Sequence, residues 1–303
     1  MDRYSAIITE ISKMGGAVIC RDEPLSRHTS FKIGGNAALM IFPEDPQTLA
    51  MVCAVFARAG EKPFVMGNGT NLLFPDEGFA RPIINTSKMH SPAEILEGDK
   101  IRFPAGMNLA TAATIAAKNA LGGMEFAHGI PGTIGGAISM NAGAYGGEMK
   151  DIVFESRCVD ANGEIFTLSA REHDFGYRRS AISEKGYTVI DAVMHLTAGS
   201  AAAISECMAE LAAKRRESQP LEYPSAGSVF KRPQNGYAAA MIDQAGLKGL
   251  TVGGAQVSEK HAGFMINVGG ATCKDVVELI DRVRREVYRQ TGTLLETEVK
   301  VIV

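Results

Sequence analysis

The spacing of apolar residues divides the chain into helices and strands. Apolar side chains that recur every three or four residues, bounded by capping residues or glycine, predict helices. The expected helices lie at 7–14, 46–59, 109–121, 200–218, 236–247 and from Thr272 onward. Short apolar or alternating runs predict strands. The expected strands lie within 17–20, 28–43, 63–74, 101–106, 153–168, 187–197, 251–270 and 295–303.

Single residues sharpen some of these boundaries. Asn162-Gly163 predicts a type I′ turn between two strands, because both residue types tolerate positive φ. Asp45 and Asn108 are expected to cap the helices that follow them, and Ser169 a short helix leading to residues 175–180. Helices and strands alternate after residue 200, so a smaller α/β domain is expected to begin near there.

Glycine is concentrated in two loops between these elements. Residues 122–147 hold nine of the 33 glycines, too many for a regular helix or strand, and interrupting apolar residues argue against a flexible linker. A run of glycine amides near the start of a short helix can hold an anionic phosphate group. Residues 67–71, the first loop in chain order, are another loop of this kind, and residues 122–147 are the second loop. A plain glycine-rich turn is the alternative for both, and neither has Rossmann or P-loop spacing.

Composition narrows the class of protein. The chain has 303 residues, 46% hydrophobic, and a formal net charge of −3, which gives no reason to expect nucleic acid as a partner. No apolar run is long enough to span a membrane and the N-terminus has no signal core, so a cytoplasmic protein is expected. Five scattered cysteines argue against a disulfide framework and a metal site, and most are expected to be buried.

Familiar catalytic motifs do not identify the reaction. The sequence holds no H-E-x-x-H, no G-x-S-x-G and no cluster of histidine with cysteine. Three residues are of interest: Arg178 after an aromatic residue, Ser228 between a glycine and an apolar run, and Glu298 in the last expected strand. Taken one at a time, a surface arginine, a turn serine and a solvent-facing glutamate are the more common interpretations.

An ordered set of motifs adds what single residues do not show. The motifs, in chain order, are HTSFKIGG, GNGTNLL, HGIPGTIGGAISMNAGAYGGEM, FGYRRS, PSAGSVFKRP, GGAQVSEKHAGFMIN and LETEV. Each is modest alone, whereas the ordered set, from about residue 27 to residue 299, is highly specific. In this respect the chain resembles the UDP-N-acetylenolpyruvoylglucosamine reductase family, flavoenzymes of peptidoglycan precursor synthesis.

The resemblance implies an α+β fold of the vanillyl-alcohol-oxidase (PCMH) type. A two-subdomain FAD-binding region at 1–198, divided into about 1–85 and 86–198, would precede a smaller α/β substrate-binding domain at 199–303. The two glycine loops would surround the FAD pyrophosphate and flavin, with residues 141–143 against the isoalloxazine ring. The implied cofactor-binding residues are Gly67, Asn68, Gly69, Thr70, Asn71, Gly129, Ile130, Pro131, Gly132, Thr133, Gly135, Gly136, Asn141, Ala142 and Gly143.

The implied reaction is the NADPH-dependent reduction of UDP-N-acetylglucosamine enolpyruvate to UDP-N-acetylmuramate. Hydride passes from NADPH to N5 of FAD and, after NADP leaves, to C3 of the enolpyruvyl group. The resemblance places Arg178, with Glu298 beside it, at the developing enolate, and makes Ser228 the donor of a proton to C2. The implied substrate-binding residues are Tyr177, Lys231, Gln256 and Glu259.

Two features depart from the family pattern. Arg232 stands where other members have asparagine after the lysine, and the chain resembles the short subclass that lacks an inserted tyrosine loop over the substrate. The sequence is compatible with a monomer. Another FAD-dependent oxidase or dehydrogenase of the same superfold and a non-enzymatic nucleotide-binding protein are the alternatives.

Overall fold

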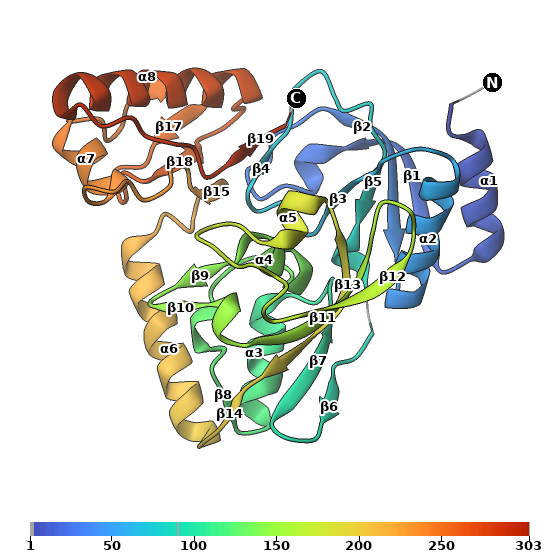
Figure 1. Ribbon diagram of the computed structural model, residues 1–303. Coiled ribbons are helices and arrows are strands. Elements are labelled where there is room, and N and C mark those ends of the chain that lie inside the picture. Colours follow the sequence, from blue (N-terminus) through green and yellow to red (C-terminus); the bar gives the residue numbers. More distant parts are fainter. Residues whose placement is uncertain (1–2, 90, 303) are drawn as a thin grey trace. The chain divides into compact units, whose positions relative to one another are not determined.

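The chain forms two compact units that are interleaved in sequence. The computed structural model describes residues 3–89 and 91–302 (Figure 1). The first unit consists of the described residues through 21 together with 39–68 and 81–213. The second unit consists of 22–38, 69–80 and the chain from 214 onward. The backbone therefore passes from one unit to the other several times.

Two sheets form the framework of the first unit. One has the strand order β1-β2-β5-β3, in which β2 and β3 both pair with β5 in parallel. The other has the order β12-β11-β13-β7-β6 and is antiparallel throughout. Their strands are β1 (Ala17–Pro24), β2 (Asn36–Pro43), β3 (Phe64–Met66), β5 (Ile83–Asn85), β6 (Glu94–Leu96), β7 (Lys100–Pro104), β11 (Val153–Val159), β12 (Ile165–Ser169) and β13 (Thr188–His195).

Helices and short segments surround these sheets. The helices are α1 (Ser5–Met14), α2 (Pro46–Arg58), α3 (Leu109–Lys118), α4 (Ile134–Met140), α5 (Ala181–Lys185) and α6 (Ala201–Ser218). The shorter strands are β8 (Leu121–Gly122), β9 (Gly143–Ala144), β10 (Gly147–Glu148) and β14 (Thr197–Ala198). Single 3₁₀ turns occur at η2 (Thr86–Lys88), η3 (Glu125–Ala127) and η4 (Met149–Asp151). As predicted, α2 is capped by Asp45, whose Oδ1 accepts the Thr48 N–H at 2.8 Å.

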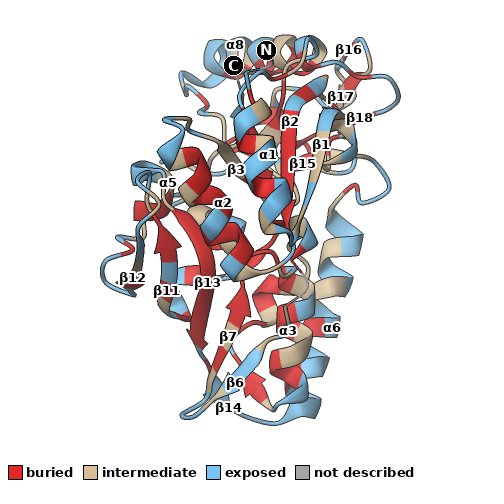
Figure 2. Ribbon diagram, turned by 90° about the vertical axis from the view of Figure 1, so that its right-hand side faces the viewer, coloured by how far each residue is buried: buried red, intermediate tan, exposed pale blue. Residues whose placement is uncertain are grey.

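Two hydrophobic clusters make up the core of the first unit. One gathers around β7, β13, α3 and α4, and the other between α1, α2 and β2. Strand β13 is buried along nearly its whole length, whereas α6 buries only Ile204 and Met208 (Figure 2). Gly135 lets α4 approach the sheet, because a Cβ there would lie 3.1 Å from the Ala105 Cβ.

The second unit packs a long helix against a small sheet. The sheet has the order β15-β18-β17-β16, and α8 lies over β16 and β17 (Figure 1). Asp76 ties residues 69–80 to this helix, because its carboxylate accepts the Cys273 N–H at 2.8 Å at the start of α8. The elements are η1 (Leu25–Arg27), β4 (Leu72–Leu73), β15 (Ser225–Ser228), α7 (Ala238–Gln244), β16 (Thr251–Val252), β17 (Ala255–Val257), β18 (Phe264–Asn267), α8 (Cys273–Thr291) and β19 (Lys300–Val301).

Three predictions based on single residues are wrong in detail. The hairpin of β11 and β12 has a longer loop than a type I′ turn, because the Asp160 N–H bonds to Glu164 O. The Asp160 carboxylate also accepts the Asn162 and Glu164 N–H groups, which favours the longer loop. The Asn108 side chain does not cap α3. Ser169 starts no helix, since its N–H and hydroxyl both donate to the Glu172 carboxylate at the end of β12.

A buried polar cluster supports the segment from His173 to Ala181. The His173 ring is fully buried, with Nε2 2.9 Å from Ser156 Oγ, and stacks on Phe175 with 4.8 Å between centroids. The Ala181 N–H closes the segment by donating to His173 O at 2.7 Å. Burial lowers the pKa of His173 to about 4. The ring is therefore neutral in the folded protein at physiological pH.

We expect His173 to make folding stability pH-dependent between its ordinary pKa of 6.5 and about 4. Within that window the unfolded chain binds a proton that folded His173 does not, so stability falls as pH falls. His173→Gln lacks this titration and should lose less stability on acidification than wild type. Thermal midpoints at about pH 7 and about pH 5 measure the difference. An equal loss in both proteins would contradict the expectation.

Candidate active site

The two glycine loops lie against each other in the first unit. Asn68 Nδ2 donates to Asn108 Oδ1 at 2.7 Å and to Pro131 O at 3.4 Å. A Cβ on Gly67 would lie 2.2 Å from Thr133 Oγ1, which is closer than real atoms approach. Gly67 and Asn68 thus pack on the second loop in a way that only glycine at 67 allows. The Asn108 amide, predicted as a helix cap, instead receives a hydrogen bond from the first loop.

Neighbouring elements hold the second loop by its backbone. The Leu109 N–H donates to Gly132 O at 3.0 Å, and the Ile134 N–H donates to Met107 O at 2.9 Å. Thr133 Oγ1 accepts the Gly136 N–H at 3.3 Å and so caps α4. The loop is therefore attached to the start of α3 at the point where it enters α4. Residues 129–132 are half-buried or exposed, so this part of the loop is not enclosed in the core.

The remaining residues of the first loop belong to the second unit. The Ser30 N–H donates to Gly69 O at 3.3 Å, and Gly69 has a φ of 61° that favours glycine. Thr70 follows in a half-buried position, and Asn71 Nδ2 donates to Glu298 O at 3.0 Å. These contacts connect the loop to a segment that carries a predicted catalytic residue.

Asn141 joins three segments of the first unit. It ends α4 in the left-handed conformation, with a φ of 43°, and its side chain is fully buried. Its Nδ2 donates to Glu148 Oε2 at 2.8 Å and to Gly176 O at 3.0 Å, while its Oδ1 accepts the Lys150 N–H at 2.9 Å. The amide is thus occupied inside the protein. Its effect on the site is to shape the backbone of Ala142 and Gly143.

Arg178 lies at the tip of a tight turn. The backbones of Gly176 and Arg179 exchange hydrogen bonds of 3.1 and 3.3 Å around it. Its φ is 56°, a conformation that costs free energy for any residue with a Cβ. Its Nη2 donates to Gly143 O at 3.3 Å, while the exposed ring of Tyr177 lies 5.0 Å from the guanidinium carbon. The structure thus brings the predicted catalytic arginine to the predicted flavin loop.

The adjacent arginine has a different environment. Arg179 forms ion pairs with Asp174 at 3.2 Å and Glu184 at 2.6 Å, on the outside of the turn. These carboxylates raise the pKa of Arg179, and the hydrogen bond that Arg179 donates to Glu184 is the largest cause. The two arginines of the FGYRRS motif therefore have separate roles, and only Arg178 contacts residues 141–143.

Ser228 and Glu298 lie on adjacent segments of the second unit. Ser228 is exposed at the end of β15, and the next residue, Val229, accepts the Glu298 N–H at 2.7 Å. The Lys231 N–H likewise donates to Glu296 O at 2.8 Å, and Lys231 Nζ lies 3.3 Å from Glu296 Oε2. The prediction that Glu298 belongs to the last strand is not met, because β19 begins only at Lys300.

The other predicted substrate residues occupy the same unit. Gln256 is half-buried on β17, and its Nε2 donates to Thr251 Oγ1 at 3.0 Å. Glu259 is exposed beyond the end of this strand. Arg232, which departs from the family pattern, stacks 4.2 Å from the ring centroid of the exposed Tyr237.

Glu148 was not among the predicted site residues. Its carboxylate accepts from Asn141 and lies 2.9 Å from Lys150 Nζ. These two hydrogen bonds, Lys150 first, lower the pKa of Glu148, and the charges of Lys150 and Arg178 act in the same direction. The residue stands in the GAYGGEM motif, but nothing in its spacing indicates that it pairs with Gly143 across β9 and β10.

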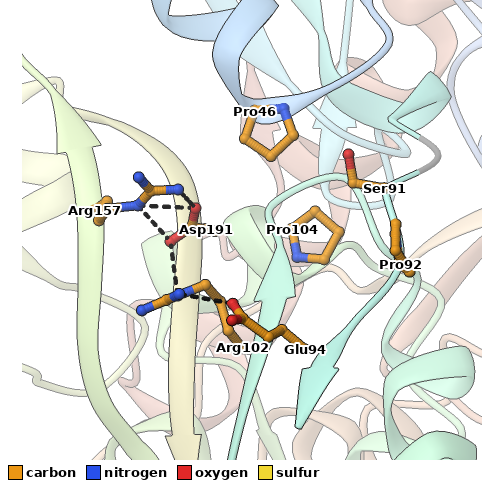
Figure 3. A pocket seen from close by; sticks show the side chains of 8 residues that line it. All are labelled: Pro46, Ser91, Pro92, Glu94, Arg102, Pro104, Arg157 and Asp191. Carbon is orange, nitrogen blue, oxygen red and sulfur yellow. Dashed lines mark hydrogen bonds and ion pairs between the residues drawn. The ribbon is translucent and has the colours of Figure 1, made fainter. Parts of the chain in front are cut away.

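A cavity of about 180 Å³ lies over one face of the antiparallel sheet, with lining side chains from β6, β7, β11 and β13 (Figure 3). Arg157 Nε donates to both carboxylate oxygens of buried Asp191 at 3.0 Å, and Arg102 Nη1 donates to Glu94 at 2.7 Å. None of the predicted site residues lines this cavity. The ion pairs of Arg157 with Asp191 and of Arg102 with Glu94 join side chains on four strands and are therefore structural. The lining residues are Pro46, Ser91, Pro92, Glu94, Arg102, Pro104, Arg157 and Asp191.

The buried cysteines are unreactive thiols. Burial raises the pKa of Cys53 to about 12 and those of Cys158 and Cys273 to about 11, as expected for small hydrophobic residues. Among residues 3–89 and 91–302, no group of three or more His, Cys, Asp or Glu side chains could hold a metal ion. Within the same ranges, every helix is too short or too polar to cross a membrane.

Comparisons with known proteins identify similar sequences along the chain. A family model described as an FAD binding domain matches residues 37–169, and the C-terminal domain model of UDP-N-acetylenolpyruvoylglucosamine reductase matches residues 219–302. The reductase of that name from Caldanaerobacter subterraneus subsp. tengcongensis is 45% identical over 97% of this chain and 96% of its own length. The one from Clostridium tetani is 42% identical over 100% and 98%, respectively.

A solved structure extends the similarity to the fold. The crystal structure of UDP-N-acetylenolpyruvylglucosamine reductase (MurB) from Thermus caldophilus has a TM-score of 0.78 and 33% identity, covering 95% of this chain and 99% of that one. The match confirms the predicted α+β class, with an FAD-binding region before the C-terminal domain. By sequence over its full length, and by fold, the chain belongs to the UDP-N-acetylenolpyruvoylglucosamine reductase family.

Proposed function

We propose that the protein reduces UDP-N-acetylglucosamine enolpyruvate to UDP-N-acetylmuramate, with FAD as cofactor and NADPH as reductant. Membership of the reductase family and the FAD-binding domain match support an FAD-dependent oxidoreductase. The observation that carries the proposal is the hydrogen bond from Arg178 to Gly143, which brings a permanent cation to the glycine-rich region of the FAD-binding domain. We further propose that residues 1–198 carry FAD and that residues 199–303 form the substrate-binding domain, in a cytoplasmic protein that does not bind nucleic acid.

The glycine loops suit an anionic cofactor. Residues 129–132 are half-buried or exposed, and Gly67 lets the other loop pack directly on Thr133. Backbone N–H groups in such loops bind phosphate without a charged side chain. The predicted residues of both loops would hold FAD, which when bound supplies hydride transfer between NADPH and the enolpyruvyl group.

Arg178 is suited to bind the enolpyruvyl carboxylate and stabilise the enolate. A guanidinium is always charged and can donate two parallel hydrogen bonds to a carboxylate. Its turn is held at both ends by backbone hydrogen bonds, so the cation is positioned before substrate arrives. Preorganised charge of this kind is a large part of the stabilisation of transition states. We propose Glu298 as a further catalytic residue, and Tyr177 as one of the substrate contacts.

Ser228 is proposed to protonate C2. A serine hydroxyl is a poor acid in water, so its transfer requires a strongly basic acceptor such as the enolate. Ser228 is exposed at the end of β15. The next residue, Val229, is held in place because its carbonyl accepts the Glu298 N–H. Lys231, Gln256 and Glu259, in the same unit, are proposed to contact the sugar nucleotide.

The overall proposal is tested by following NADPH consumption with and without UDP-N-acetylglucosamine enolpyruvate. We expect consumption to depend on that substrate and UDP-N-acetylmuramate to accumulate in equal amount. Consumption at the same rate without the substrate would favour another flavin-dependent oxidase or dehydrogenase.

Gly67→Ala should reduce the amount of FAD bound. The new Cβ must displace Thr133 Oγ1, which breaks the α4 cap and moves the second loop. Loss of such a cap costs about 1 kcal/mol, so the protein should still fold. Flavin absorption per mole of purified protein measures the effect. Gly199→Ala, where the nearest atom would lie at 3.6 Å, is the control, and an equal flavin content in both variants would contradict the prediction.

Ser228→Ala should affect only the second half of the reaction. Bleaching of the flavin by NADPH is expected within about twofold of wild type, because no proton from Ser228 is needed. Recovery of flavin absorption on adding the enolpyruvyl substrate should slow by about 10²-fold or more, the usual contribution of a general acid. Ser225→Ala, on the same strand, serves as the matched control. Equal slowing of both halves would show that Ser228 is not the proton donor.

A further inference from the structure

The Glu148 carboxylate is linked to the Arg178 turn through one amide. Oε2 of Glu148 accepts from Asn141 Nδ2 at 2.8 Å, and the same nitrogen donates to Gly176 O at 3.0 Å. Gly176 forms the base of the turn, because its backbone exchanges both hydrogen bonds with Arg179. The orientation of the Asn141 amide therefore couples the position of Glu148 to that of the turn.

The ribbon of β9 and β10 provides a second link. Glu148 pairs with Gly143 across this ribbon, and Gly143 O accepts from Arg178 Nη2 at 3.3 Å. A Cβ on Gly143 would lie 2.7 Å from both Glu148 Cγ and Gly147 O. Gly143, whose carbonyl accepts from Arg178, thus lies so close to the Glu148 side chain that only glycine fits there.

The charges of Glu148 and Arg178 favour the same arrangement as these contacts. The hydrogen bonds from Lys150 and Asn141 lower the pKa of Glu148, and the charge of Arg178 lowers it further. The carboxylate is therefore ionised beside the guanidinium, and attraction between them favours the observed turn. Arg178 needs this support, because a residue with a Cβ stays at a φ of 56° only when its surroundings hold it there.

We propose that Glu148 is a positioning residue that holds Arg178 against Gly143 for the enolpyruvyl substrate. The inference rests on the proposed function, since it requires Arg178 to contact the substrate carboxylate. Glu148 itself acts through Asn141, through Gly143 and through its charge, without touching the reacting atoms. It also has a local structural part, in the capping box that it forms with Asp151 at η4, and the test must separate the two.

The first measurement compares Glu148→Ala, Glu148→Gln and the control Glu184→Ala. Glu184 pairs with Arg179 on the outer side of the same turn, so its removal tests general disturbance of the segment. In Glu148→Ala we expect flavin bleaching by NADPH within about twofold of wild type and reoxidation by substrate slowed by roughly 10- to 100-fold, as for a misplaced catalytic group. Glu148→Gln should lose less, because its Oε1 still accepts from Asn141.

Two readouts do not depend on turnover. The dissociation constant for UDP-N-acetylmuramate should rise in Glu148→Ala and stay near wild type in Glu184→Ala. Flavin content and thermal midpoint show whether each variant is folded. A purely structural role for Glu148 would lower both and slow the two halves of the reaction equally, which would overturn the inference.

A double-mutant cycle decides whether Glu148 acts through Arg178. Adding Glu148→Ala to Arg178→Ala should change the reoxidation rate by less than about twofold, because residues that act as a unit are not additive. Independent, additive losses would overturn the inference. Should Glu148→Ala lose its flavin, the same cycle with Glu148→Gln gives the answer. Wild-type protein with no substrate-dependent reoxidation would overturn the proposed function itself, whereas additive losses in an active enzyme overturn the role of Glu148 alone.

Discussion

The buried amide of Asn141 is the constraint on which the candidate site of the first unit depends. Its nitrogen and oxygen reach the Glu148 carboxylate, Gly176 O and Lys150 N–H, so Asn141 joins the segment 148–150 and the turn at residue 176 to the end of α4. Buried polar groups must be fully satisfied, so a residue with fewer donors would leave some of these partners unpaired. The left-handed backbone at this position also favours asparagine over most other residues. One side chain therefore sets both the end of α4 and the place of the Arg178 turn.

Much of the fold follows from local sequence. Asp45 and Thr272 were predicted to begin helices, and their side chains accept the expected N–H groups. The family resemblance implies that the two glycine loops belong to one FAD site. The loops are in contact at Gly67, Asn68, Pro131 and Thr133, and their binding of FAD stays a prediction. The cap predictions succeed because capping depends on residues only a few positions apart.

The errors arise where a side chain has a distant competitor. Asn108 has the residue type and place of a cap, yet Asn68 lies 40 positions away and takes its amide oxygen. Arg178 and Arg179 are indistinguishable by pattern, because the difference is a backbone φ and a contact with Gly143. Glu148 is missed for the same reason. The spacing of residues does not distinguish Arg178, Ser228 and Glu298 from ordinary surface residues, whereas the family resemblance does. Their assignment as a catalytic set stays a prediction.

Interleaving of the two units has a consequence for how the protein is made. Phe31, Ile33 and Leu73 belong to the hydrophobic core formed by the C-terminal residues, and Asp76 completes the start of α8. During translation these early segments leave the ribosome long before the C-terminal residues that they pack against. Their apolar surface therefore stays exposed to water while most of the chain is synthesised. Contacts of such long sequence separation slow folding and expose the nascent chain to aggregation. A fragment that begins at residue 199 would also lack part of its own hydrophobic core. The second unit is therefore a compact domain in space, but it is not a continuous segment that can be transferred between genes or expressed alone.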